Sequence, residues 1–319
     1  MNYYRPIVMT DAARSKASVA LAGGWCWFDR VEKISRDGTH RLLDLSEVPA
    51  EVMARLTAPR PPLVSLSLDA PRVMAIVNVT PDSFSDGGRF VSLQDALAFS
   101  GAAAMQGADI LDIGGESTRP GALTVGETEE VARTAPLIHA IRASGMDIPI
   151  SVDTRKARVA EAAVDSGADL VNDVSALLYD PAMAAVVAAG DAMVCLMHSQ
   201  GGPGDMQIDP RYENVLLDVY DHLEERIRAA EAAGIDRARI VVDPGIGFGK
   251  TLAHNLELLR GISLFHSLGC ALLLGVSRKR FIGTIGRAEN PAGRMPGSVA
   301  LALAAVGQGV QILRVHDVA

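Results

Sequence analysis

"VMAIVNVTPDSFSDGG", residues 73–88, starts as an apolar run and ends as a polar loop. Its first five residues carry no polar side chain, which predicts a short buried strand. Pro81, Gly87 and Gly88 favour bends in the loop that follows, and the loop holds no His, Cys, Lys or Arg. An alanine-rich helical stretch comes next, at 92–107. The local unit is therefore a strand, a polar loop and a helix.

The same unit recurs along the rest of the chain. We expect strands near 73–79, 110–115, 149–154, 170–175, 192–198, 240–245, 271–277 and 312–318. Helices are expected at about 92–107, 125–145, 156–167, 181–189, 212–233, 253–268 and 297–309. Such an alternation over about 250 residues matches a (β/α)8 TIM barrel. A doubly wound open sheet is the alternative, but its glycine fingerprint should follow the first strand, where this chain has "NVTPDSF".

Both ends of the chain depart from a plain barrel. Residues 1–71 form an N-terminal extension ahead of a barrel domain at 72–319; its role is left open, with packing preferred over chemistry. Within it, "LVSLSL" at 63–68 could pair with the first barrel strand as a hairpin that closes the barrel floor. The sequence stops soon after the last strand, so the eighth helix is predicted to be missing or truncated; either the chain is shortened, or another segment or subunit covers that flank.

Composition and charge narrow the class of protein. The 319 residues are 49% hydrophobic, enough for a large core, and the net charge of -8 argues against a nucleic-acid or membrane-surface protein. Cys26, Cys195 and Cys270 are far apart, so neither a disulfide framework nor structural zinc is expected, and a cytoplasmic location is predicted. Every long apolar stretch is interrupted, which argues against a membrane span.

Polar side chains occur where nearly every predicted strand ends. The active site of a barrel lies at these carboxyl ends, so the side chains should meet at one mouth. In chain order they are Asn78, Gly114–Arg119, Asp153–Arg155, Asn172 and Asp173, His198, Asp243, Ser277–Lys279, Arg314 and His316. Each alone could be a cap, a turn residue or a solvated charge. Their convergence is hard to explain by folding, because buried polar groups without partners cost free energy.

The residue types at this mouth indicate what it binds. An acceptor-rich group on one side suits a flat heterocycle with several N–H donors, such as a 2-amino-4-oxopyrimidine ring. Its members are Asp153, Asn172 and Asp243. A cationic group suits an anion, and a neighbouring amide oxygen could hold a hard cation such as Mg²⁺. The cationic members are Lys279, Arg314 and His316, and the amide is that of Asn78.

Other catalytic signatures are absent from the sequence. "DPGIGFGKT" at 243–251 places Pro244 where a nucleotide-binding P-loop needs its first glycine. His198 has no second histidine or carboxylate at metal-ligand spacing, which favours a structural role or a place behind the residues that contact the ligand. No Ser-His-Asp or Cys-His nucleophile signature is legible.

Seven motifs at the strand ends together resemble one family. They are "NVTPDSFSDGG", "GADILDIGGESTRPG", "ISVDTRKA", "LVNDVSAL", "VVDPGIGFGKT", "GVSRKRFIG" and "RVHDV". In this order, across about residues 72–318, they resemble the bacterial dihydropteroate synthases. The resemblance implies a (β/α)8 transferase of folate biosynthesis. Its reaction joins 6-hydroxymethyl-7,8-dihydropterin diphosphate to p-aminobenzoate and releases diphosphate and 7,8-dihydropteroate.

The resemblance also implies roles for individual residues. Asp153, Lys279 and Arg119 would be catalytic, and Asn78 would bind Mg²⁺. Substrate-binding residues would be Thr118, Pro120, Asn172, Met197, Asp243, Phe248, Gly275, Ser277, Lys279, Arg314 and His316, with Phe84 and Asp86 closing over p-aminobenzoate. The partners would be these small molecules and, as is typical of the family, a second copy in a homodimer. Because sulfonamides mimic p-aminobenzoate, the site would be a sulfonamide target.

The residue chemistry is compatible with an SN1-like path. An aniline nitrogen is largely unprotonated at neutral pH, so no strong base is needed. Cations would stabilise the departing diphosphate, while anionic Asp153 would stabilise positive charge on the ring. A pterin-binding methyltransferase is one alternative, although it has no use for the Arg314 and His316 diphosphate clamp. A non-catalytic pterin-binding partner subunit is the other, although no polar rim residue is missing.

Overall fold

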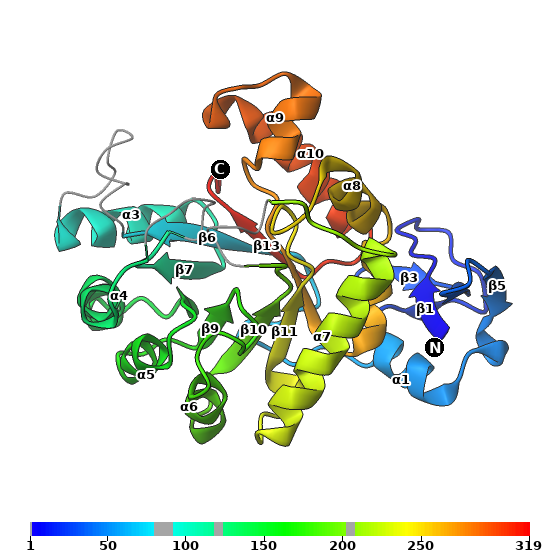
Figure 1. Cartoon of the computed structure of the whole chain (residues 1–319), viewed down its shortest axis with the longest axis horizontal. Coiled ribbons are helices and arrows are strands. Elements are labelled where there is room, and N and C mark those ends of the chain that lie inside the picture. The colour runs from blue at the N-terminus through cyan, green and yellow to red at the C-terminus, as the bar shows by residue number, and fades with distance from the viewer. Residues whose placement is uncertain (1, 80–91, 118–123, 202–207) are drawn as a thin grey trace.

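The computed structural model describes residues 2–79, 92–117, 124–201 and 208–319 (Figure 1). The bends predicted at Pro81, Gly87 and Gly88 lie outside these residues. Within the described part of the chain, no helix combines the length and the apolar character needed to cross a membrane.

Eight parallel strands form a closed barrel at the centre of the molecule (Figure 1). In chain order they are β6 (Arg72–Asn78), β7 (Ile110–Gly114), β8 (Ile150–Asp153), β9 (Leu170–Asp173), β10 (Met193–Met197), β11 (Ile240–Asp243), β12 (Ala271–Leu274) and β13 (Ile312–Val315). Each strand pairs with the next in the chain, and β13 closes the barrel on β6, where Arg314 is opposite Met74. The predicted (β/α)8 fold is confirmed.

Helices in the strand connections pack around the barrel. They are α3 (Leu93–Met105), α4 (Glu127–Ala143), α5 (Ala157–Asp165), α6 (Met183–Ala189), α7 (Val215–Ala232), α8 (Leu252–Arg260), α9 (Arg280–Gly286) and α10 (Met295–Val306). Local side chains fix several starts: Ser92 caps α3, Asn214 caps α7 and Thr251 caps α8, each by accepting a bond from a backbone N–H in the first turn. These contacts place the helix boundaries close to the predicted ones.

Two helix predictions were inaccurate. The single helix expected at 253–268 is wrong, because α8 ends at Arg260 and a 3₁₀ helix, η3 (Ile262–Leu268), follows. At Gly261 between them, an added Cβ would lie 2.6 Å from Leu216 Cδ2, so the close approach of α7 leaves no room for a larger residue. The short helix α9 was not predicted, since its two glycines weaken the helical pattern.

The barrel floor is filled by an apolar cluster. Leu63 and Leu68, from the segment before β6, pack inside the barrel with Met74, Ile110 and Ile312. The predicted hairpin between 63–68 and the first barrel strand is wrong. Leu63 instead bridges Leu66 within its own turn, because both edges of β6 are already paired, with β13 and β7. The segment closes the floor as a plug of side chains.

The N-terminal extension forms small sheets beside the barrel (Figure 1). Its elements are β1 (Asn2–Pro6), β2 (Val19–Ala20), β3 (Trp27–Phe28), β4 (Arg30–Ser35), β5 (His40–Asp44), η1 (Leu45–Glu47) and α1 (Ala50–Thr57). The sheet order is β1-β4-β5, and β2 pairs with β3. Trp25 Nε1 donates to the Val306 carbonyl oxygen at 3.0 Å, and Tyr3 donates to Asp221 at 2.8 Å, so the extension is bonded to α10 and α7.

The last described residues, 316–319, continue from β13 without a helix. They line a groove together with Phe99, Ala103 and Gln106 of α3. The residues after β13 therefore lie beside α3.

Candidate active site

The carboxyl ends of the strands bring buried polar side chains to one mouth. Registry places Gly114 of β7 opposite Asp153 of β8, and Asp153 opposite Asn172 of β9. Asp243 ends β11 beside Met197. All of these residues, the glycine included, are at least nine-tenths buried. The strand ends thus assemble the acceptor-rich group as predicted.

Arg314 lies among these acids rather than apart from them. Its Nε donates to Asp112 Oδ2 at 2.6 Å, and its Nη2 donates to Asp153 Oδ2 at 2.7 Å. The expected separation of acidic and cationic residues on different sides of the mouth is therefore wrong for Arg314. The reason is that β13 closes the barrel next to β6, which lets a long side chain reach across the interior toward β7 and β8.

Asp112 was missed by the sequence reasoning. It is completely buried in β7, and Asn172 Nδ2 donates to its Oδ2 at 3.4 Å. The available signal was a lone acid between Leu111 and Ile113 in an otherwise apolar strand. A charge in such a position needs a partner, and here Arg314 provides it.

Two carboxylate oxygens in this group keep free acceptor capacity. Among the residues that the structure describes, Asp112 Oδ1 and Asp153 Oδ1 are buried and accept no hydrogen bond. Burial raises the pKa of Asp153 to about 7, with Arg314 opposing the shift and Asp112 adding to it. Such an arrangement is unfavourable by itself and suits a ligand that brings N–H donors.

Asp243, Lys279 and Phe248 form the next part of the mouth. Asp243 Oδ1 accepts from the Gly245 N–H at 2.7 Å, which fixes its carboxylate. Lys279 Nζ donates to the Ile246 carbonyl oxygen and lies 4.7 Å from the centroid of the Phe248 ring. Burial lowers the pKa of Lys279 to about 8, with Asp243 opposing the shift. The amine is therefore still mostly protonated at neutral pH but loses its proton at a lower pH than an ordinary lysine.

Gly275 keeps space open beside this lysine. A Cβ added there would lie 3.8 Å from Lys279 Nζ and 3.9 Å from Arg314 Cβ. The predicted substrate-binding glycine thus lies between the two cations that the sequence singled out.

Ser277, His316 and Asn78 complete the described rim. Ser277 Oγ is 3.0 Å from His316 Nδ1 and accepts the His316 backbone N–H at 3.1 Å. Asn78 and Asp153 flank Gly114: a Cβ built there would lie 3.4 Å from Asn78 Oδ1 and 3.5 Å from Asp153 Cβ. The amide of Asn78 is therefore on the acidic side of the mouth, next to the pocket of Asp153.

His198 and Lys250 form a buried pair behind the rim. Lys250 Nζ lies 2.8 Å from His198 Nδ1 and donates to the Phe248 carbonyl oxygen at 2.9 Å. Burial holds the pKa of each well below its usual range. Lys250 is therefore buried and bonded inside the protein, whereas the lysine of a P-loop has to reach a bound phosphate. They agree with the structural role expected for His198.

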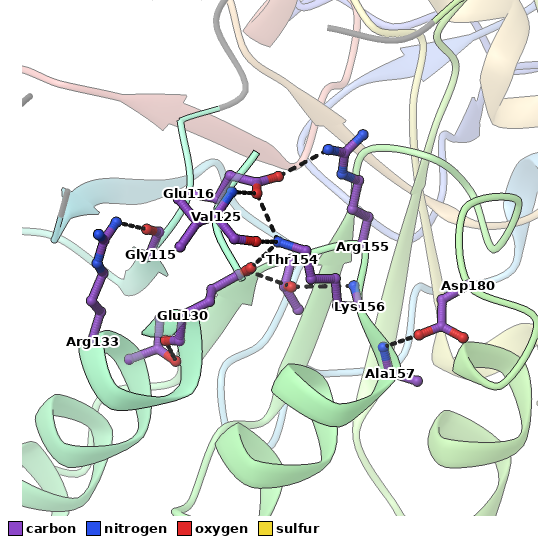
Figure 2. Close-up of polar contacts among 11 residues, drawn as sticks. Gly115, Glu116, Val125, Glu130, Arg133, Thr154, Arg155, Lys156, Ala157 and Asp180 are labelled. Atoms are coloured by element: carbon purple, nitrogen blue, oxygen red, sulfur yellow. Dashed lines mark hydrogen bonds and ion pairs between the residues drawn. The ribbon is translucent and has the colours of Figure 1, made fainter. Parts of the chain in front are cut away.

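A second polar network lies under the connection between β7 and α4, and Figure 2 shows it. Lys156 Nζ contacts Glu116 Oε2 at 2.7 Å and also contacts Glu130 Oε2. Arg155 Nη2 lies 3.1 Å from Glu116 Oε1. Sequence reasoning did not single out Lys156 or Glu130, because no local pattern links positions in α4 to the segment between β8 and α5.

Five predicted site residues lie outside the described part of the chain. They are Phe84, Asp86, Thr118, Arg119 and Pro120. The roles given to them, in catalysis and around p-aminobenzoate, stay predictions.

The fold and the mouth define a (β/α)8 barrel with buried acidic side chains beside cationic ones at the carboxyl ends of its strands. The family model of pterin binding enzymes matches residues 74–316. The dihydropteroate synthase of Neisseria meningitidis serogroup C is 48% identical over 256 residues, which cover 79% of this chain and 90% of that protein. The chain therefore belongs to the pterin-binding enzyme family and, within it, to the dihydropteroate synthases.

Solved structures agree with this assignment. Dihydropteroate synthase from Xanthomonas albilineans with 4-aminobenzoic acid is 48% identical, with a TM-score of 0.76 over 82% of this chain and 94% of that one. The same enzyme in complex with 7,8-dihydropteroate is 45% identical, with a TM-score of 0.73 and the same coverage. The family model begins at residue 74, so the extension 1–71 lies outside the matched region.

Proposed function

We propose that the mouth performs its transfer by an SN1-like path assisted by Mg²⁺. The activity is that of the family: 6-hydroxymethyl-7,8-dihydropterin diphosphate and p-aminobenzoate condense to 7,8-dihydropteroate and diphosphate. The observation that carries the proposal is the pair of buried, unsatisfied oxygens at Asp112 and Asp153 next to Arg314. A ring with several N–H donors satisfies these oxygens on binding.

The pterin ring occupies the acidic part of the mouth in this proposal. Asp153, Asn172 and Asp243 accept from its N–H groups, and Lys279 donates to a ring acceptor. Asp112 holds Arg314 and Asn172 in place. Because Asp112, Asp153, Asn172 and Asp243 are buried on strands, the geometry of these four side chains is set before the substrate arrives.

The diphosphate lies toward His316 and Arg314, the pair that the resemblance assigns to it. Their donors balance the charge that develops as the bond from the methylene carbon to the departing oxygen breaks. Asp153, ionised above its pKa of about 7, stabilises the positive charge that appears on the ring. The p-aminobenzoate nitrogen then bonds to the methylene carbon and loses one proton.

A magnesium ion fits this site as a companion of the diphosphate. Asn78 provides an amide oxygen near the acidic pocket, and Mg²⁺ is commonly held by one or two protein oxygens together with substrate phosphates. In the described part of the chain, no cluster of three His, Cys, Asp or Glu side chains could hold a metal alone. When bound, the ion supplies positive charge to the leaving group.

We also propose a homodimer formed through α10. This helix, "MPGSVALALAAV", has no charged residue, yet Met295 is 41%, Val299 48% and Leu303 65% exposed. The three recur every four residues and so share one face. A helix with no charged residue on any face is normally buried, which supports a second copy as its cover. Sedimentation of the wild type and of Leu303→Glu tests this, because the charge should leave a monomer.

A cytoplasmic location belongs to the same proposal. Cys26, Cys195 and Cys270 are all free and buried, as is common where thiols stay reduced.

The experiment mixes pure protein with Mg²⁺, the dihydropterin diphosphate and p-aminobenzoate. We expect magnesium-dependent release of diphosphate together with dihydropteroate. A second arm omits p-aminobenzoate and measures diphosphate loss alone. Slow loss in that arm supports the SN1-like path, whereas loss that strictly requires p-aminobenzoate contradicts it.

A further inference from the structure

The loop between β11 and α8 contacts the side chain of Lys279 through three consecutive residues. Lys279 Nζ donates to the Ile246 carbonyl oxygen and lies 4.7 Å from the centroid of the Phe248 ring. Between these two residues, a Cβ added at Gly247 would lie only 3.1 Å from Lys279 Cδ, so the aliphatic stem of the lysine passes directly over this glycine. The position of the ammonium therefore depends on how this loop is folded.

Asn255 of α8 holds the peptide unit at the centre of this contact. Its Oδ1 accepts the Gly247 N–H at 2.7 Å, and that N–H belongs to the same peptide unit as the Ile246 carbonyl. A continuous chain of hydrogen bonds therefore runs from the Lys279 ammonium through this peptide to Asn255. Hydrogen bonds in such a chain polarise one another, which makes the carbonyl oxygen a better acceptor.

Gly247 would otherwise let this peptide unit turn over. Its φ is +85°, and glycine adopts the opposite sign of φ about as readily. Turning the peptide unit over would reverse the sign of this φ and point the Ile246 oxygen away from Lys279. The bond to Asn255 opposes that rotation, because it is made only in the observed orientation.

The needs of α8 do not account for an asparagine at position 255. Asparagine is a poor residue inside a helix, because its side chain competes with the backbone for hydrogen bonds. Asn255 is only 2% exposed, and its Nδ2 donates to the Thr251 carbonyl oxygen at 2.8 Å, which leaves Oδ1 directed at the loop. The helix already has a cap, since Thr251 Oγ1 accepts the His254 N–H at 3.2 Å.

The charge of Lys279 is set by several neighbours. Burial lowers its pKa to about 8, with Asp243 of β11 opposing the shift and Arg314 of β13 adding to it. Burial also holds the pKa of Lys250, at the end of the loop, well below its usual range, with Asp243 opposing the shift and Lys279 adding to it. A carbonyl oxygen aimed at the Lys279 ammonium opposes the effect of burial, since a hydrogen bond to the charged form favours that form.

We propose that Asn255 is a positioning residue that aims the Ile246 carbonyl oxygen at the Lys279 ammonium. By keeping this acceptor in place, Asn255 holds Lys279 protonated at the mouth and fixes the direction of its N–H groups. The effect on turnover rests on the proposed function, whereas the state of Lys279 in the free protein does not. A side chain that merely stabilised α8 would leave the pKa of Lys279 unchanged.

Titration of Lys279 by NMR tests this in the full chain. The sequence has five lysines, so protein labelled with ¹³C at lysine Cε gives few signals, from Lys16, Lys33, Lys156, Lys250 and Lys279. The signal that Lys279→Met removes is that of Lys279. In the wild type this signal should titrate with a pKa of about 8.

Asn255→Leu removes the acceptor and keeps a side chain of similar size. We expect it to lower the pKa of Lys279 by about one pH unit, the effect of losing one hydrogen bond to a charged group. Asn255→Asp keeps an acceptor in the same place, so the pKa should not fall below that of the wild type. Thr251→Ala is the matched control and should keep the wild-type pKa, because it removes the cap of α8 but leaves the bond between Gly247 and Asn255.

The pH profile of kcat/KM for the dihydropterin diphosphate is the second measurement. Because the ammonium form is the active one, a lower pKa of Lys279 moves the alkaline limb of the profile to lower pH. Asn255→Leu should therefore lose about tenfold in kcat/KM near pH 9 but only about twofold near pH 7. Thr251→Ala should follow the wild-type profile. A general structural defect would lower kcat/KM without this dependence on pH.

An unchanged titration of Lys279 in folded Asn255→Leu overturns the proposal, and so does an equal shift in Thr251→Ala or in Asn255→Asp. If Asn255→Leu does not fold, Asn255→Ala is titrated in its place. If neither folds, the asparagine is needed for the fold as such and the positioning role is rejected. The expected titrations in a protein that forms no dihydropteroate support the positioning role and overturn the proposed function instead.

Discussion

The two ends of the barrel contrast sharply although the same strands build both. At the floor, Met74, Ile110 and Ile312 pack with Leu63 and Leu68 in a fully apolar cluster. At the mouth, a few residues further along the same strands, Asp112 and Arg314 form a buried ion pair, and carboxylate oxygens lack partners among the described residues. The floor is fully packed in the free protein, whereas the buried carboxylate oxygens of the mouth need a ligand to provide hydrogen-bond donors.

This difference separates stability from function. Apolar burial at the floor favours folding, so removing side-chain volume there lowers the free energy of unfolding. At the mouth, the buried charges cost free energy, and ligand donors recover it. Substitutions at the two ends should therefore affect different measurements.

The largest effect is expected for Asp153→Asn. The amide keeps the shape and can still accept from Arg314, but it cannot carry the negative charge that stabilises the ring. We expect kcat/KM to fall by about 10²–10³, as for other preorganised electrostatic groups. Thermal unfolding should show no loss of stability, because burial disfavours the ionised carboxylate that the neutral amide replaces. Near-normal synthase activity of the variant would refute the assignment of Asp153 to the pterin pocket.

The counterpart at the floor is Leu68→Ala. Leu68 is 2% exposed, so the substitution leaves a cavity and should lower the free energy of unfolding by about 2–5 kcal/mol. Denaturant titration measures this, and kcat/KM at a temperature where the variant stays folded should remain within about twofold of wild type. A large loss of activity in the folded variant would show that the ends are coupled.

The pH profile of kcat/KM for the dihydropterin diphosphate sharpens the description of the mouth. Asp153 must be ionised, so activity should fall about tenfold per unit as the pH drops below about 7. Lys279 must be protonated, so activity should also fall as the pH rises above about 8. Nearby charges also shift the pKa of Asp153 and with it the acid limb. The charge of Arg314 lowers this pKa, whereas those of Asp112, Glu130 and Asp173 raise it. An acid limb near the ordinary carboxyl pKa of about 4 would contradict the assignment.

The smallest effect is expected for Ile312→Val at the floor. Removing one methylene from this fully buried side chain should cost about 0.5–1.5 kcal/mol in the free energy of unfolding. Turnover should be unchanged, as measured alongside wild type. If this variant slows turnover more than it destabilises the fold, the floor contributes to the site after all.

Much of this architecture was predictable because its causes are local. Apolar runs separated by polar loops and alanine-rich stretches fixed the eight strands to within a few residues, and β6 at Arg72–Asn78 is an example. The same periodicity placed Asp153, Asn172 and Asp243 at strand ends, where a barrel gathers its site. It failed at η3, because the close packing of Leu216 on Gly261 is not a local property.

The sequence by itself determined the barrel, its acidic strand ends and, through its motifs, the family. Only the tertiary structure decided which charges meet. Arg314 bonds Asp112 across a separation of 202 residues, and Lys156 bonds Glu116 across 40. The floor plug of Leu63 and Leu68 likewise depends on both edges of β6 being occupied. Such contacts exist only once the barrel closes, because no periodicity along the chain specifies which side chains face each other across its interior.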